Sequence, residues 1–168
     1  IGIDEEIEPS MSILPDYMVI GSLDNLKEDS SIIIGTWLAA HLDVGIGDTL
    51  NITTSDIKTT IIGSFPQSLK VKIVGMYELR SELDQSLVLI SHKLAQKIKM
   101  IGENTTSSIR IKTDDLFSAD TIARDVIKSI DGDLLNGNFF EIITWKTTHG
   151  TLFEAIKFEK LLISLMLF

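Results

Sequence analysis

Apolar residues recur at strand-like and helix-like intervals along the first hundred residues of the chain. Short apolar or alternating runs indicate strands, and apolar positions three or four residues apart indicate helices. Strands are predicted at residues 17–20, 32–34, 50–54, 71–77 and 87–91, and helices at residues 36–42 and 92–101. The strand at 17–20 is predicted to be buried, and residues 55–69 are predicted to form a loop.

The second half of the chain continues this alternation of elements. Residues 108–113 alternate like a strand, residues 116–130 have helical spacing, and residues 139–145 are predicted to be the last strand. Asp114 and Asp115 stand at the start of the helix, where negative charge and capping oxygens are favoured. Strands interleaved with helices indicate an α/β or α+β fold, in two small lobes that meet near residues 28 and 103.

Residues 153–168 change character partway along one predicted helix. Glu154, Lys157 and Lys160 recur every three residues, which is the mark of a helix with one wet face. From 161 to 168 only Ser164 is polar, and a helix that is apolar all round needs a bilayer or a deep core around it. Eight residues rise only about 12 Å, whereas a membrane span takes roughly 20 residues. We interpret 161–168 as the start of a transmembrane helix in a longer protein; the alternative is the core helix of a soluble domain.

Composition narrows the possible functions. The 168 residues carry a net charge of −9 and contain no cysteine. A negative surface repels phosphate backbones, and a chain without cysteine has no thiolate metal sites, thiol catalysis or disulfides. The three histidines, His41, His92 and His149, are isolated, with none of the spacings that a metal site requires. We therefore expect no nucleic-acid partner, no cofactor, no metal and no enzymatic activity.

Residues 58–70 are the strongest candidate for a binding segment. If residues 50–54 and 71–77 pair as a hairpin, the connection is far longer than usual, and long connections in compact domains tend to be functional or disordered. Ile61, Ile62 and Phe65 place apolar side chains on it, and Pro66 narrows its conformational freedom. The alternative is a short extra hairpin folded back on the core. The predicted partner-binding residues are Ile61, Ile62, Gly63, Ser64, Phe65, Pro66, Gln67 and Ser68.

Several segments, taken in order, resemble one family of membrane proteins. Together they cover most of the chain, and the last of them includes the apolar C-terminal helix. The segments are GSLDNL, IIIGTWLAAHLDVGIGDTLNI, VKIVGMYELRSELDQSLVLISHKLAQKI, IRIKTDD followed by FSADTIARDV, and TWKTTHGTLFEAIKFEKLL. The chain resembles the LolC/LolE permeases of the lipoprotein-releasing ABC transporter of Gram-negative bacteria, within the MacB-like superfamily.

The resemblance implies an α+β MacB-like periplasmic domain with a porter-like lobe and an inserted Sabre-like lobe, ending in the start of a transmembrane helix. Residues 1–28 and 104–150 would form the porter-like lobe, and residues 29–103 the Sabre-like lobe. Residues 151–168 would form the connecting helix and the start of the transmembrane helix. Residues 58–70 occupy the place of the Hook, the hairpin that recruits the soluble carrier LolA in LolC-type members.

The function implied is non-catalytic. The intact protein would lie in the inner membrane, with this segment mainly in the periplasm, and would release outer-membrane lipoproteins and hand them to a LolA-type carrier. ATP would be hydrolysed by separate cytoplasmic subunits, and a second permease subunit would complete the transporter. The segment at 58–70 leaves LolC, LolE and a merged single-type permease open. The alternative function is the periplasmic domain of another MacB-like efflux or mechanotransmission permease.

Overall fold

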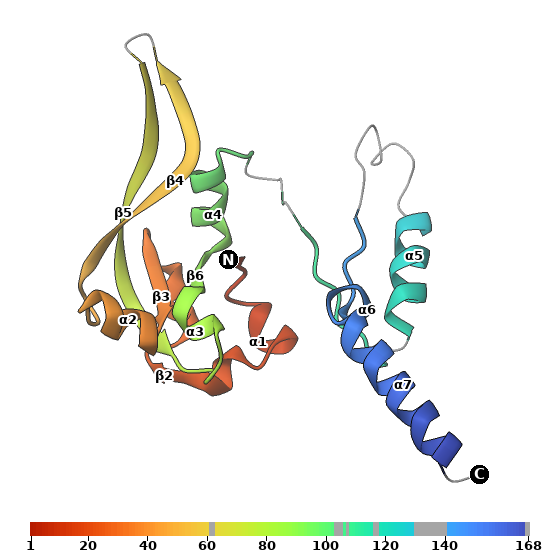
Figure 1. Ribbon diagram of the computed structural model, residues 1–168. Helices are drawn as coiled ribbons and strands as arrows, with labels where there is room; N and C mark the ends of the chain where they lie inside the picture. Colours follow the sequence, from red (N-terminus) through yellow and green to blue (C-terminus); the bar gives the residue numbers. More distant parts are fainter. Residues whose placement is uncertain (61–62, 103–105, 107, 116–117, 130–140, 167–168) are drawn as a thin grey trace. The chain divides into compact units, whose positions relative to one another are not determined.

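The computed structural model describes residues 1–60, 63–102, 106, 108–115, 118–129 and 141–166. For residues 55–60, 63–65, 67 and 153 it describes the backbone alone. The chain divides into two compact units, Ile1–Ile109 and Arg110–Phe168 (Figure 1).

The first unit is built around one mixed six-stranded sheet with the order β1-β6-β3-β5-β2, and β4 pairs with β5. Parallel and antiparallel pairs occur side by side: β3 runs parallel to β5 and antiparallel to β6. The strands are β1 (Gly2–Ile3), β2 (Met18–Ile20), β3 (Ser31–Gly35), β4 (Thr49–Thr60), β5 (Gly63–Tyr77) and β6 (Val88–Ser91). A mixed sheet with helices on its faces confirms an α+β class.

Short helices connect these strands. They are α1 (Glu8–Met11), η1 (Leu14–Tyr17), η2 (Leu23–Lys27), α2 (Thr36–Leu42), α3 (Leu83–Ser86) and α4 (His92–Lys99). The predicted helix at 36–42 is confirmed, and the one at 92–101 ends two residues early because Met100 adopts a left-handed conformation. The sequence places an aliphatic run in β3, and every residue of this strand is buried, as in a strand covered on both faces.

Two apolar clusters form the core of the first unit. Ile32 and Ile73 belong to one cluster, into which Leu94 of α4 packs. Ile33 belongs to the other, into which Leu26 of η2 packs. Neighbouring residues of a strand point to opposite faces, so the run of isoleucines in β3 supplies both clusters.

Two predictions for the first unit are wrong. The described residues of 55–69 belong to β4 and β5, so they are not a loop. Residues 53–60 contain only one apolar residue, Ile57, so no apolar alternation marks a strand there. The strand predicted at 17–20 exists as β2, but Val19 is 54% and Ile20 48% exposed because β2 lies at the edge of the sheet.

The second unit is helical in the part that the structure describes, with α5 (Ala119–Ser129), α6 (Trp145–Thr148) and α7 (Gly150–Met166). Residues 108–113 and 141–144 are not strands, although strands were predicted there. Residues 139 and 140 lie outside the described residues. An alternating sequence forms a strand only where a neighbour accepts its backbone hydrogen bonds, and the described part of this unit supplies none.

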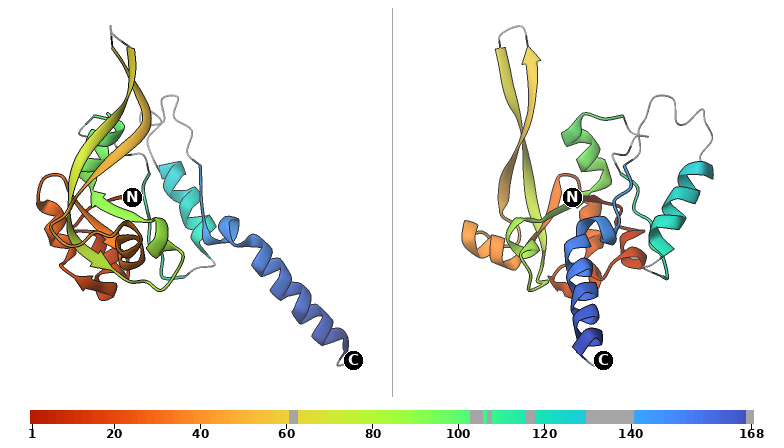
Figure 2. Two further views of the ribbon diagram at one scale, coloured as in Figure 1. Left: turned by 60° about the vertical axis from the view of Figure 1, so that its left-hand side comes forward. Right: turned by 45° about the vertical axis from the view of Figure 1, so that its right-hand side comes forward.

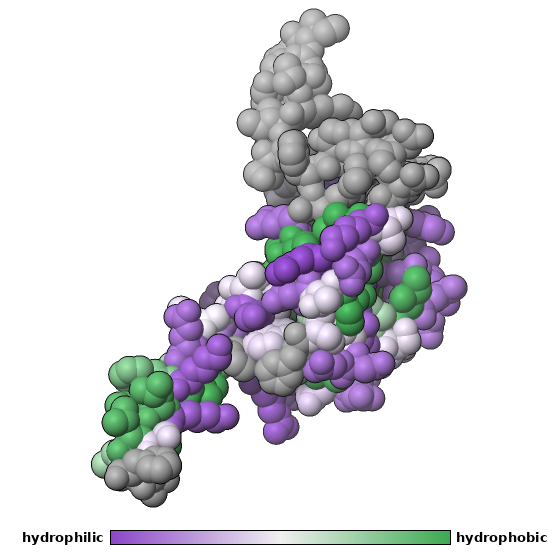
Figure 3. Space-filling view, turned by 90° about the vertical axis from the view of Figure 1, so that its right-hand side faces the viewer, coloured by the Kyte–Doolittle hydropathy of each residue, from purple (hydrophilic) through white to green (hydrophobic). Residues whose placement is uncertain are grey.

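Helix α7 presents apolar side chains to solvent over its last turns. The exposed residues are Leu161, Leu162, Ile163, Leu165 and Met166. In Figure 3 this part of the helix is the green, apolar region at the lower left, next to the grey end. The interpretation of residues 161–168 as the start of a transmembrane helix stays a prediction. Among the described residues, no helix combines the length and the hydropathy that a membrane crossing requires.

The division into porter-like and Sabre-like lobes stays a prediction. Within the first unit, β1 pairs with β6 and β2 pairs with β5, which joins residues 1–28 to residues 71–91 in one sheet.

Candidate partner-binding hairpin

The candidate binding segment is the far end of a β-hairpin formed by β4 and β5. At its base, Leu50 pairs with Val71, and Ile52 pairs with Leu69. Leu50, Ile52 and Leu69 are partly buried against the apolar cluster that contains Ile73. The base of the hairpin is therefore fixed to the core of the first unit.

A register shift separates this base from the projecting part. Thr53 pairs with Ser68, and the next pair is Ile57 with Pro66, so β4 advances four residues while β5 advances two. Extra residues on one strand bend a strand pair and increase its twist. In Figures 1 and 2 the hairpin twists and extends away from the rest of the first unit.

Beyond the shift the two strands pair up to Thr60 and Gly63. Residues 61 and 62, which follow Thr60 and precede Gly63 in the sequence, lie outside the described residues. Residues 63–68 of β5 have only β4 as a neighbouring strand, and six residues of strand span about 20 Å. Each sequence-based alternative is therefore right in part. The described residues of 58–70 lengthen the hairpin, as one alternative held, but this part projects from the first unit and does not fold back on the core.

The other predicted site residues, Gly63, Ser64, Phe65, Pro66, Gln67 and Ser68, form one continuous stretch of β5. Phe65 lies opposite Lys58 in the register, and Pro66 and Ser68 are exposed. Proline cannot donate a ladder hydrogen bond, and a two-stranded ribbon tolerates it because its outer edge faces water. The stretch is stiffened by strand pairing as well as by Pro66.

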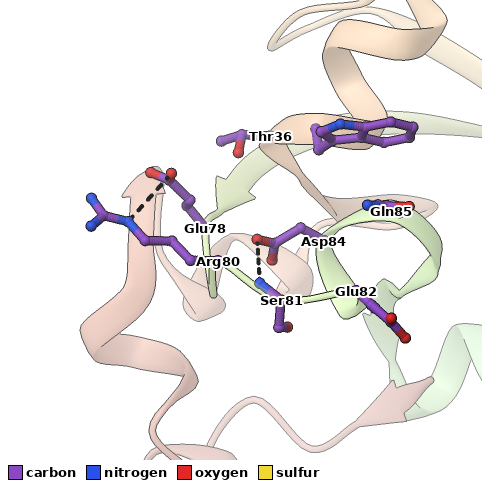
Figure 4. A pocket seen from close by; sticks show the side chains of 8 residues that line it. Thr36, Glu78, Arg80, Ser81, Glu82, Asp84 and Gln85 are labelled. Carbon is purple, nitrogen blue, oxygen red and sulfur yellow. Dashed lines mark hydrogen bonds and ion pairs between the residues drawn. The ribbon is translucent and has the colours of Figure 1, made fainter.

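Among the residues that the structure describes, no group of three or more His, Cys, Asp or Glu side chains could hold a metal ion. Two of the three histidines make local contacts: His41 stacks on Trp37, and the Nε2 atom of His92 lies 3.0 Å from the amide nitrogen of Gln96. Sequence reasoning missed an open cavity of about 570 Å³ beside α2, which is lined by Thr36, Trp37 and residues between 78 and 85 (Figure 4).

Comparison with known proteins identifies relatives along nearly the whole chain. The lipoprotein-releasing system transmembrane protein LolC of Xylella fastidiosa (strain 9a5c) is 27% identical over 168 residues, covering 99% of this chain. LolC of Buchnera aphidicola subsp. Schizaphis graminum is 33% identical over 129 residues, or 76% of the chain. LolE of Haemophilus influenzae is 20% identical over 158 residues, or 93% of the chain. No protein-family model matches the chain.

The resemblance to LolC and LolE is therefore confirmed. The chain spans 39% of the length of the Xylella relative, 30% of the Buchnera relative and 36% of the Haemophilus relative. It corresponds to one segment of these proteins.

Proposed function

We propose that this chain, a homologue of one segment of the LolC and LolE proteins, is the periplasmic domain of an ABC transporter permease that releases lipoproteins from the inner membrane. Its relatives are named as transmembrane proteins of a lipoprotein-releasing system. The domain performs no chemistry. It couples ATP hydrolysis on separate cytoplasmic subunits to the release of outer-membrane lipoproteins, together with a second permease subunit.

The hairpin of β4 and β5 is the docking element for a soluble LolA-type carrier. One observation carries this proposal: the base of the hairpin packs on the core, and in its far part β4 and β5 pair only with each other among the described strands. A preformed strand pair loses little conformational entropy on binding. Its far end also bears Ile61, Ile62 and Phe65, the apolar residue types that anchor protein interfaces.

Helix α7 connects the domain to the membrane. Its apolar residues from Leu161 onward need an apolar environment, and a bilayer supplies it. The intact protein would thus lie in the inner membrane, with the first unit and its hairpin in the periplasm.

The test is a hairpin truncation that keeps the sheet intact. Thr53 and Ser68 are paired across the hairpin, so residues 54–67 can be replaced by an Asn-Gly turn without disturbing the base. Calorimetric titration with the LolA-type carrier of the same bacterium should give binding for the natural chain and none for the truncated chain. Unchanged circular dichroism and unfolding temperature would show that the truncated chain is folded.

Two outcomes would contradict the proposal in different ways. Equal binding by the truncated chain would exclude the hairpin as the docking element. No binding by the natural, folded chain would favour the periplasmic domain of another MacB-like efflux or mechanotransmission permease, with a different partner.

A further inference from the structure

The sheet of the first unit has open strand edges of very different lengths. Strand β1 has two residues and β2 has three, whereas β4 is a long strand that pairs on one side only, with β5. No other described strand lies against the second side of β4. An open strand edge presents backbone N–H and C=O groups that can pair with a strand of another chain. The outer edge of β4 is therefore a candidate for such pairing.

The register of the hairpin decides which backbone groups face outward. Lys72 donates its backbone N–H to the carbonyl oxygen of Ser30 at 2.8 Å, on the side of β3, so it faces away from β4. Directly opposed residues of an antiparallel pair alternate between bonding to each other and both facing away. Thr49, which lies opposite Lys72, therefore directs its N–H and C=O groups to the open edge. Asn51 and Thr53 do the same, because they follow at intervals of two residues.

The outer edge of β5 differs from that of β4 because its sequence opposes pairing. Strand β3 occupies this edge from Lys72 onward, and Lys70 and Pro66 share the part that lies before it. Proline has no N–H to donate, and lysine at an edge discourages the approach of another strand. Residues 49–53 of β4 include neither a proline nor a charged residue. Of the two edges of the hairpin, the one at residues 49–53 is therefore open to a further strand.

The apolar core reaches this edge without being fully covered there. Leu50 and Ile52 pack against the cluster that contains Ile73, but both remain only partly buried. A strand added to β4 would lie about 4.8 Å away, and its apolar side chains on the same face would complete this burial. On the opposite face, Thr49 and Asn51 are exposed polar residues. The occupant that fits is an extended segment in which apolar and polar residues alternate.

We propose that the LolA-type carrier adds one of its strands to residues 49–53 of β4. This inference rests on the proposed docking of the carrier to the hairpin, and it names a second contact in that interface. Strand β4 runs from this edge to the far end of the hairpin, so one partner can contact both. A short strand pair alone is marginal in water, and the pairing therefore adds to the contacts of the far end and does not replace them. A second copy of this chain fits less well, because a net charge of −9 makes copies repel each other.

The first test is amide hydrogen exchange, followed by nuclear magnetic resonance, on the natural chain with and without the carrier of the same bacterium. The amides of Thr49, Asn51 and Thr53 should exchange at least about tenfold more slowly in the complex, because an added strand accepts their hydrogen bonds. The amide of Leu50 faces β5 and should change little. Slower exchange at Lys70 instead would place the added strand on β5 and overturn the proposal.

The second test removes one outward N–H group. Asn51→Pro deletes a donor that faces away from β5 and places the proline ring toward the incoming strand, so the affinity for the carrier should fall at least about tenfold in calorimetric titration. Asn51→Ala is the matched control, because it keeps the N–H group and shortens only an exposed side chain. It should bind within about twofold of the natural chain. An unchanged unfolding temperature and slow exchange at Val71, which faces β4, would show that the proline variant keeps the hairpin.

The outcomes separate strand addition from the docking of the hairpin. If Asn51→Pro binds as well as the natural chain, or if the three outward amides exchange as fast in the complex as without the carrier, strand addition is overturned. The docking of the far end would stand in that case, provided that the truncated hairpin fails to bind. An equal loss of affinity in Asn51→Ala would assign the effect to the side chain and would also overturn pairing through the backbone. If the carrier does not bind the natural chain, both proposals are wrong.

Discussion

The hydroxyl of Thr144 donates a hydrogen bond of 2.7 Å to Oδ1 of Asp120, which joins α5 to the residue that caps α6. Lys146 lies 3.6 Å from the other oxygen of the same carboxylate. Thr144 is buried, so loss of its acceptor leaves a hydroxyl without this partner. The carboxylate of Asp120 thus fixes the N-terminus of α6, the helix that precedes α7.

Replacing Asp120 should therefore loosen α6. We expect Asp120→Ala to lower the free energy of local opening by about 1 kcal/mol, the typical value of one partly buried hydrogen bond, and to speed amide exchange about fivefold at residues 145–148. Asp125→Ala is the control, because Asp125 makes only an exposed ion pair with Lys128. Equal effects of the two variants would contradict a specific role for the Asp120–Thr144 contact.

Gly35 should not tolerate a side chain. Its Cβ position collides with backbone atoms of Asp84, which cannot move aside as a flexible side chain would. We expect Gly35→Ala to destabilise the first unit by about 2 kcal/mol in urea unfolding. Gly45→Ala is a matched control, because the one atom that its Cβ would approach is Oδ2 of Asp48, at an ordinary contact distance of 3.7 Å. A stability change equal to that of the control would disprove the close approach.

Tyr77 should make the first unit sensitive to high pH. Burial, with a smaller contribution from the charge of Asp84, raises the pKa of Tyr77 to about 12 from its ordinary value of 10.0. The folded chain therefore holds the phenol proton more tightly than the unfolded chain. Its contribution to stability is complete below about pH 10 and is lost as the pH rises through about 12.

Unfolding in urea at several pH values between 9 and 12 measures this effect. Tyr77→Phe should remove the corresponding slope, whereas Tyr17→Phe should retain it, because Tyr17 is exposed. Tyr77→Phe should also lower stability at pH 7 by about 1 kcal/mol, since the hydroxyl donates to a backbone carbonyl. An unchanged slope in Tyr77→Phe would refute the assignment.

Phe65 should dominate carrier binding. Truncating a desolvated aromatic anchor costs about 2 kcal/mol or more, so Phe65→Ala should weaken the affinity about thirtyfold or more in calorimetric titration. Pro66→Ala should weaken it less, because strand pairing also orders this stretch. Asn51→Ala, at an exposed position of β4 outside residues 58–70, serves as the control. A loss of only twofold to fivefold in Phe65→Ala would assign Phe65 to the rim of the interface.

The end of α7 should enter the membrane in the intact protein. Residues 161–168 are apolar apart from Ser164, and those up to Met166 are exposed here. A reporter fused shortly after the complete apolar stretch should be found in the cytoplasm. A periplasmic reporter would show that the stretch does not cross.

The local pattern of the sequence correctly predicted elements that bury one face or both. The aliphatic run of β3, the helix α2 and the spacing of Leu94 in α4 all report contact with a core. The same pattern failed for the far part of the hairpin, because residues 53–60 include only one apolar residue and therefore show no apolar alternation. Its place in the chain, between the strands that form its base, could be predicted, but its strand character could not.

Other features depended on which segments meet. Residues 108–113 have a strand-like sequence but no strand partner in the described part of the second unit, and β2 has a buried-looking sequence at an exposed edge. The cavity combines Trp37 with residues more than forty positions away, around Glu82. Sequence periodicity shows only which face of a helix or strand is apolar. Pairing, edges and cavities arise from contacts between distant segments, and these are decided by tertiary packing.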